Sequence, residues 1–221
     1  MNDRAGDLAG AGVPAKSGPR RRGPASPRGF TLLELLTVIA VIGILSAILI
    51  PTVGSARVAA KKAKTKVQFS QWAAALEQFK QEYGYYPPVD NGTGKIDPAR
   101  FVGALSARNL DGSAITDSTA AALCGNKKLI SFYALSEAEL SADHSKIVDP
   151  FGNSDIAVIY DKNADGRLTG TDGSALAVAG VNASFAPPVS DLDLSTGLRA
   201  GVVFYSAGKG DNESDLVFSW K

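Results

Sequence analysis

The chain has very little of the chemistry that enzymes use. It contains one cysteine, Cys124, and one histidine, His144, among 221 residues. It has no nucleophile elbow, no glycine-rich phosphate loop and no group of histidines and cysteines at metal-ligand spacing. A single cysteine cannot close a disulfide within the chain. These absences argue against an enzyme and favour a binding or structural role.

The distal part of the chain also has too few basic residues for a typical nucleic-acid-binding domain. Residues 84–221 carry 17 acidic side chains and 11 basic ones, whereas residues 1–29 carry six basic and two acidic ones. Contacts to phosphates need clustered lysine and arginine. The acidic surplus of the distal part therefore argues against nucleic-acid binding by that part and suits cation binding better.

One long apolar run is present, and it extends from Phe30 to Pro51. About 20 residues at a rise of about 1.5 Å span the hydrocarbon core of a bilayer. The preceding residues 1–29 are basic and rich in proline and glycine, which is typical of an unfolded leader. Glu34 is the one residue of the run that hydrophobicity does not explain.

Three interpretations of the run remain open. It could be a secretory signal peptide, although it is longer than the usual apolar region of one. It could be a plain membrane anchor that tolerates Glu34 because the positive end of the helix dipole favours an anion there. Alternatively, cleavage after Gly29 would give Phe30 a positive amino group, and Glu34 would then have a partner about one turn away, in its own or a neighbouring chain.

The segment Gly29-Phe30-Thr31-Leu32-Leu33-Glu34 resembles the cleavage and methylation motif of type IV prepilins and of the pseudopilins of type II secretion systems. The resemblance implies that Gly29 ends the leader, that Phe30 becomes the N-methylated first residue, and that Glu34 is needed for assembly. Residues 149–153 (D-P-F-G-N) are similar to a turn of the major pseudopilins, and the ending F-Y-S-A-G-K-G-D-N-E-S-D-L-V-F-S-W is similar to their C-terminus.

A second helical pattern follows the apolar run. Large apolar side chains recur at intervals of three and four residues, which places them on one face of a helix; they are Phe69, Trp72, Leu76, Phe79 and Tyr83. Gly84 and the prolines after it predict the end of this helix. If Pro51 only kinks the chain, residues 30–83 form one helix, apolar in its first half and amphipathic in its second.

The remaining sequence predicts short elements. Helices are expected at 98–105 and 116–123, and residues 128–135 suit either a strand or a helical turn. Strands are expected at 156–160, 176–178, 201–205 and 216–220. The prediction is an α+β fold in which a long N-terminal helix packs on a small antiparallel sheet with an irregular loop region. Its parts are a leader (1–29), a membrane half-helix (30–51), an amphipathic half-helix (52–84) and a globular head (85–221).

Two acidic loops are candidate calcium sites. Residues 161–172 follow the spacing D-x-N-x-D-G…D, in which oxygen ligands converge while a glycine allows the turn. The candidate ligands are Asp161, Asn163, Asp165, Arg167 and Asp172. An ordinary hairpin turn favours the same residues. The pseudopilin resemblance implies the alternative, a structural calcium near Asp211, Ser214 and Asp215.

Taken with the resemblance, these patterns predict a subunit of a type II secretion pseudopilus that a prepilin peptidase processes and that polymerises through its N-terminal helix. The implied partners are identical subunits, minor pseudopilins and an inner-membrane assembly platform. The implied location is the bacterial inner membrane, crossed once, with the head in the periplasm. A type IV pilin, major or minor, and a membrane-anchored calcium-binding protein that never polymerises are the alternatives.

Overall fold

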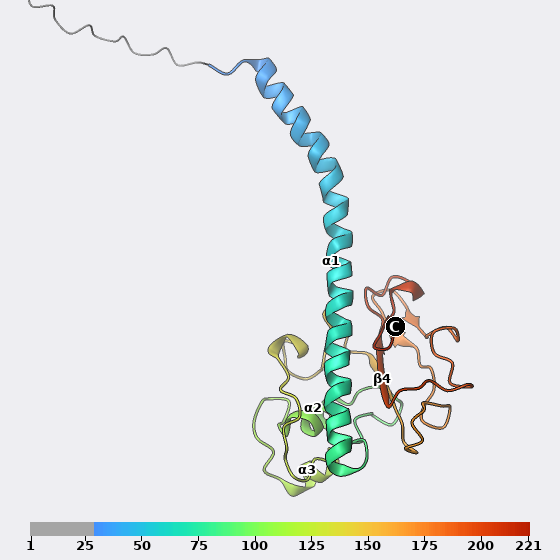
Figure 1. The fold of residues 1–221 in the computed structure, drawn as a ribbon. Helices are drawn as coiled ribbons and strands as arrows, with labels where there is room; N and C mark the ends of the chain where they lie inside the picture. The colour runs from blue at the N-terminus through green and yellow to red at the C-terminus, as the bar shows by residue number, and fades with distance from the viewer. Residues whose placement is uncertain (1–28) are drawn as a thin grey trace, which may run out of the picture. The chain divides into compact units, whose positions relative to one another are not determined.

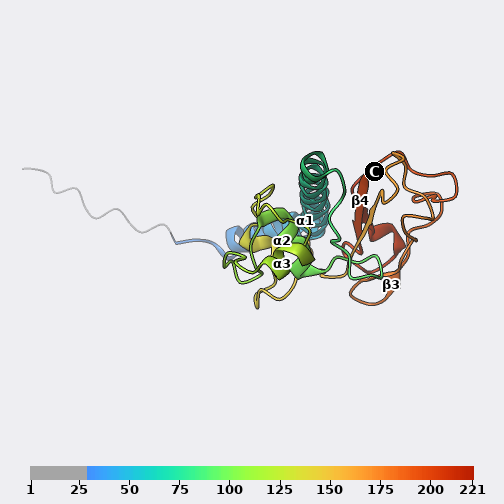
Figure 2. The same cartoon turned by 90° about the horizontal axis from the view of Figure 1, so that it is seen from below.

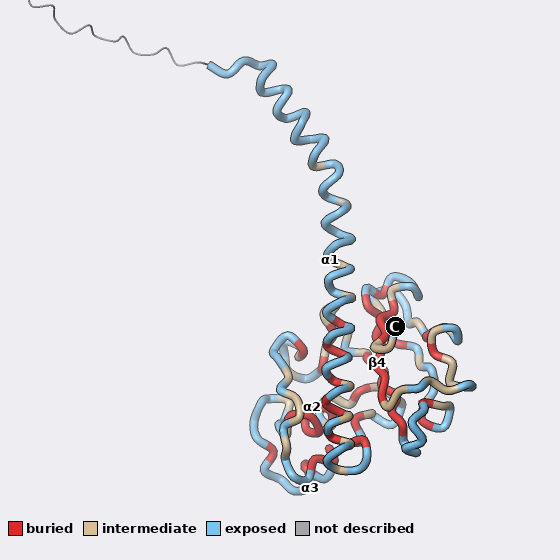
Figure 3. The backbone as a smooth tube through the Cα atoms, viewed as in Figure 1, coloured by how far each residue is buried: buried red, intermediate tan, exposed pale blue. Residues whose placement is uncertain are grey.

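The computed structural model describes residues 29–221, so the predicted leader lies outside the described residues except for Gly29. The chain divides into two units, of which the first ends at Ile48 and the second is Leu49–Lys221. The first helix, α1 (Leu32–Tyr83), begins in the first unit and ends in the second. Figure 3 shows that α1 is exposed along its N-terminal part and has buried residues toward its C-terminal end.

The long helix is continuous through Pro51, as the kink alternative predicted. Proline has no N–H to donate to the carbonyl one turn earlier, so continuity there costs one backbone hydrogen bond. The helix ends at Tyr83, where Gly84 adopts a φ of +82° and donates its N–H to the Lys80 carbonyl at 2.8 Å. This left-handed residue is the reason that the chain turns at the predicted glycine.

Within the second unit, the amphipathic half of α1 lies between two short helices and a sheet (Figures 1 and 2). The helices are α2 (Pro98–Ser106) and α3 (Ser118–Leu123). Each begins after an aspartate, Asp97 or Asp117, whose carboxylate accepts a hydrogen bond from a backbone N–H of the first turn. The two predicted helices are confirmed, with bounds shifted by one or two residues.

The sheet has the order β1-β4-β5 and is antiparallel throughout. Its strands are β1 (Ile156–Tyr160), β4 (Val202–Ser206) and β5 (Val217–Phe218). Val158 lies opposite Phe204 in the register of β1 with β4. A separate two-stranded hairpin pairs β2 (Val178–Ala179) with β3 (Ser184–Phe185). The predicted α+β architecture is confirmed.

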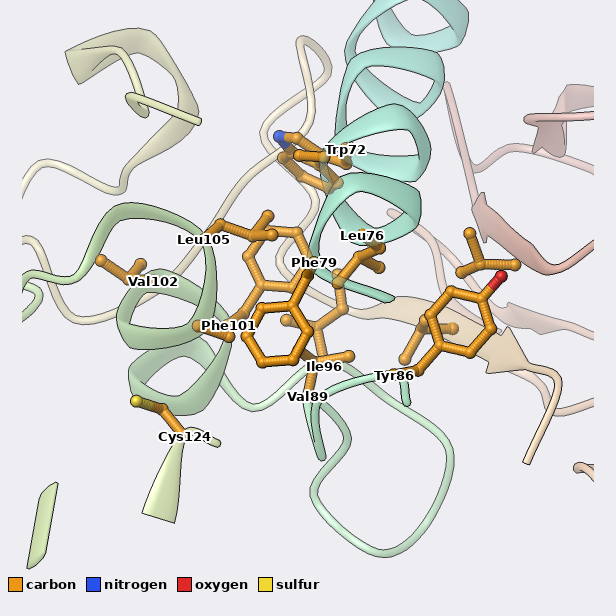
Figure 4. Packing of buried hydrophobic residues seen from close by; sticks show 14 of the residues in the cluster. Trp72, Leu76, Phe79, Tyr86, Val89, Ile96, Phe101, Val102, Leu105 and Cys124 are labelled. Atoms are coloured by element: carbon orange, nitrogen blue, oxygen red, sulfur yellow. The ribbon is translucent and has the colours of Figure 1, made fainter. Parts of the chain in front are cut away.

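The strands separate two apolar clusters because side chains alternate between the faces of a sheet. Val158 and Phe204 face the predicted stripe of α1, and the Phe204 ring lies 5.8 Å from that of Phe69 and 5.7 Å from that of Trp72. Figure 4 shows the same cluster from α1 toward α2, with Trp72, Leu76 and Phe79 beside Phe101 and Leu105. The opposite face of the sheet packs against residues that include Leu168, Leu192 and Leu216.

Some predicted elements are wrong. Residues 128–135 form neither a strand nor a helix, because their backbone groups are bound by Asn126 and by the Leu105 carbonyl at the end of α2. The strand predicted at 176–178 begins at Val178 instead, and the N–H and carbonyl of Leu176 bond to the Tyr205 hydroxyl. The strand β3 and the 3₁₀ turns η1 (Glu137–Glu139) and η2 (Glu213–Asp215) were not predicted.

Candidate processing and assembly segment

The start of α1 is a capping box built from Thr31 and Glu34. The Thr31 hydroxyl oxygen accepts a hydrogen bond from the Glu34 N–H at 3.2 Å, and Glu34 Oε2 accepts from the N–H and the hydroxyl of Thr31, each at 2.8 Å. The box satisfies two N–H groups that a helix start leaves without partners. Glu34 is therefore held at the N-terminus of α1, where the helix dipole also favours a negative charge.

Gly29 and Phe30 precede this box in exposed, non-helical backbone. The Phe30 side chain is 81% exposed. A peptidase must bind its substrate in an extended conformation, and backbone already outside a helix meets that need. The predicted cleavage position is therefore accessible in the described chain, one residue before the capping box.

Beyond the box, the first half of α1 is apolar and unburied. It contains a window long and apolar enough to cross a membrane, judged by length and composition, and no residue of that window is buried. Soluble proteins rarely expose a continuous apolar surface of this size. Among the residues that the structure describes, α1 is the one helix with such a window, which indicates a single-pass anchor.

The two turns that resemble those of pseudopilins lie together in the folded head. Asp149 is buried, and its carboxylate accepts hydrogen bonds from the N–H groups of Phe151 and Asn153 at 2.9 and 2.8 Å. It also accepts from the Ser206 hydroxyl at 2.7 Å, while the Asn153 side chain reaches both Asp149 and the Gly208 carbonyl. The turn at 149–153 thus holds the end of β4 in place.

Two lysines of α1 bind these turns. The Lys61 ammonium lies 5.5 Å from the centre of the Phe151 ring. Lys62 donates to the Ser214 carbonyl at 3.0 Å and lies 3.9 Å from a carboxylate oxygen of Asp215. The C-terminal loop is therefore tied to the helix by a cation. Sequence reasoning missed this contact, because residues 152 positions apart leave no local signal of it.

The loop at 161–172 turns at Gly166 and is held by two aspartates that accept backbone hydrogen bonds. Gly166 has a φ of +80°, and Asp161 accepts from its N–H at 2.9 Å. Asp172 accepts from the N–H groups of Lys162 and Thr169. Burial raises the pKa of Asp172, but these hydrogen bonds outweigh burial and hold the pKa below its ordinary value.

The predicted ligands of both loops are already engaged by N–H groups or cations. Lys80 lies 3.8 Å from Asp161, and Lys209 lies 2.6 Å from Asp211. The Arg167 guanidinium donates hydrogen bonds to the carbonyls of Thr196 and Gly197. Across residues 29–221, no three histidine, cysteine, aspartate or glutamate side chains gather as a metal-binding group. These contacts hold both loops without an ion, and calcium at either loop stays a prediction.

Comparison with known proteins bears on the N-terminal segment. Residues 25–50 match the prokaryotic N-terminal methylation motif, which covers Gly29, Phe30 and Glu34. The motif, the exposed apolar part of α1 and the packing of its second half on a small antiparallel sheet make the chain similar to type IV pilin-like proteins.

Within that class, the chain is similar to the type II secretion system core protein G. It is 31% identical to the protein of Escherichia coli over 80 residues, which are 36% of this chain and 55% of that protein. It is 38% identical over 64 residues to the protein of Pseudomonas aeruginosa, covering 29% of this chain and 45% of the relative. The chain spans about half the length of the curated relatives it matches. No solved structure matches the chain.

Proposed function

We propose that the chain is a structural, non-enzymatic subunit of a type II secretion pseudopilus. One observation carries the proposal: Glu34, the single acid of the exposed apolar part of α1, is held in a capping box one turn after the exposed Gly29–Phe30 bond. The methylation motif at residues 25–50 and the similarity to core protein G support it.

In this proposal, a prepilin peptidase cleaves the bond between Gly29 and Phe30 and methylates the new amino group of Phe30. The apolar part of α1 then holds the chain in the inner membrane, with the head in the periplasm. Inner-membrane assembly proteins and minor pseudopilins would receive it there. During assembly, helices of neighbouring subunits replace lipid around the same apolar surface.

Glu34 would select the position of each incoming helix. Its carboxylate can accept from the Phe30 ammonium of a neighbouring chain, and the pair neutralises two charges that lipid-free packing would bury. Such a pair contributes specificity of register more than net stability. Glu34 Oε1 suits this role because, among residues 29–221, the capping bonds use Oε2.

The test compares two substitutions in the capping box. Glu34→Ala removes the charge, and we expect membrane insertion to persist while filaments are lost. Thr31→Val removes the hydroxyl that donates to Glu34 but keeps the carboxylate, so we expect filaments to form. Filament yield is measured by sedimentation and electron microscopy of cells that overproduce the secretion system.

Two results would contradict the proposal. The first is a normal filament yield from Glu34→Ala. The second is a membrane-extracted chain whose N-terminal residue is Met1 or Arg57 and not a methylated Phe30. Incorporation into surface pili that retract, with none into a secretion pseudopilus, would favour the type IV pilin alternative.

A further inference from the structure

The second unit begins with a helix surface that changes from apolar to basic. Ile50, Val53, Arg57, Lys61 and Lys64 are spaced three, four, four and three residues apart, so they share one face of α1. All five are exposed. We call residues 50–64 on this face the apolar–basic stripe.

The apolar end of the stripe has the character of an anchor. Ile50 is 74% exposed and Val53 is 47% exposed. Together with Leu49, Gly54 and Arg57 they line a shallow depression on the helix. An arginine beside exposed aliphatic side chains suits a boundary between hydrocarbon and water, because its stem can cover apolar surface while its head stays polar.

The basic end of the stripe lacks acidic partners. The sequence has no aspartate or glutamate between Glu34 and Glu77, although five basic residues lie between 57 and 66. Within the part of the chain that the structure describes, Arg57, Lys64 and Lys66 form no ion pair. Lys62 is used by the C-terminal loop. These exposed cations are therefore available to an anionic partner outside the chain.

We propose that the apolar–basic stripe binds the headgroups of anionic phospholipids before the subunit enters a filament. The inference rests on the membrane insertion of the proposed function and not on polymerisation. Residues at a rise of about 1.5 Å put Arg57 about 10 Å and Lys61 about 16 Å beyond Ile50 along the helix. Helix side chains also point back toward the N-terminus, which brings both cations nearer the lipid.

These distances predict which basic residue of the stripe contributes most to lipid binding. The headgroup layer adds about 5–8 Å to each side of the hydrocarbon core, and salt screens charges beyond about 8–10 Å. Arg57 therefore reaches headgroup depth through its long side chain, and Lys61 lies about one screening length beyond the headgroup layer. Lys64, about 21 Å beyond Ile50, lies outside the screening length. An acidic protein surface would explain the cations equally well, but it would not explain the exposed Ile50 and Val53 on the same face.

The test titrates the full chain, held in a neutral detergent, with dioctanoyl-phosphatidylglycerol and, separately, with dioctanoyl-phosphatidylcholine. Native mass spectrometry counts the bound lipid. A basic residue near a membrane surface is worth about 1 kcal/mol, which corresponds to about a five-fold change in affinity. We expect about a five-fold loss for Arg57→Gln, a smaller one for Lys61→Gln, and recovery in Arg57→Lys.

Lys127→Gln is the matched control, because it removes one exposed positive charge from the head without touching the stripe. We expect its affinity for phosphatidylglycerol to stay within two-fold of the unmodified chain. Equal affinities for the two lipids, or an equal loss in Lys127→Gln and Arg57→Gln, would overturn the inference. So would loss of filaments in Arg57→Gln with unchanged lipid binding, which would point to an acidic protein partner.

The two proposals fail in different ways. A chain that washes from membranes in carbonate contradicts the proposed function. A chain that stays in membranes and shows no preference for phosphatidylglycerol contradicts this inference alone. Thermal unfolding of each variant, followed by tryptophan fluorescence, checks that the exposed substitutions leave the head folded.

Discussion

Replacing Asp149 by alanine should destabilise the head severely, because its buried carboxylate organises the turn at 149–153. It accepts four hydrogen bonds: two from backbone N–H groups, one from the Asn153 amide and one from the Ser206 hydroxyl. Hydrogen bonds to a charged group contribute about 1.5–3 kcal/mol each, but those within one network are not additive. We expect a loss of about 3–5 kcal/mol, the range seen when one partner of a buried charged network is removed.

Asp143 provides the matched comparison for burial. Its carboxylate also accepts bonds from two serine hydroxyls and a backbone N–H, but it is exposed. After Asp143→Ala, water can accept the hydrogen bonds of these donors, so that variant should lose far less stability than Asp149→Ala. Urea unfolding of both full-length variants in detergent, followed by the fluorescence of the buried Trp72, measures the two losses. Equal losses would refute the reasoning that burial, and not the number of hydrogen bonds, sets the cost.

Two further predictions concern the second unit. If loop 161–172 binds calcium, replacing a chelator by millimolar calcium raises the Tm by several degrees, and Asp161→Asn removes this gain. If Asp215→Asn removes the gain instead, the ion belongs to the C-terminal loop. If the unmodified chain shows no gain, both calcium sites are contradicted. Burial raises the pKa of Tyr205 to about 12, so the unfolded state ionises first and stability present below about pH 10 is lost as the pH rises toward 12. Tyr205→Phe should flatten this alkaline decline in the free energy of unfolding, and an unchanged slope would contradict the assignment.

How much the sequence predicts depends on the length of each element. The stripe from Phe69 to Tyr83 repeats often enough to define a face, and the glycine after it fixes the end of α1. Strand β1 is five residues long and was predicted with its bounds. The strands β2 and β3 have two residues each, too few to display a period, and they exist because the hairpin packs on the rest of the head.

The candidate site also combines a feature that a local sequence pattern signals with contacts that no local pattern signals. The capping box was visible in the sequence as Thr31-x-x-Glu34, a local signal that the charge argument overlooked. The contact of Lys62 with the C-terminal loop, and that of Asp149 with Ser206, join residues far apart in the chain. Such contacts follow from the fold as a whole, and no local pattern of lysine or aspartate predicts them.

The capping box also changes the argument about why Glu34 is tolerated in an apolar helix. A charged residue at the centre of a membrane span costs about 2.5–3.5 kcal/mol, and the cost falls toward the interface. Glu34 lies in the first turn, where Thr31 supplies two hydrogen bonds to its carboxylate. Insertion alone therefore does not require a partner from another chain. A role in assembly requires that a neighbouring amino group compete successfully with Thr31, which is why the two substitutions in the box separate anchoring from polymerisation.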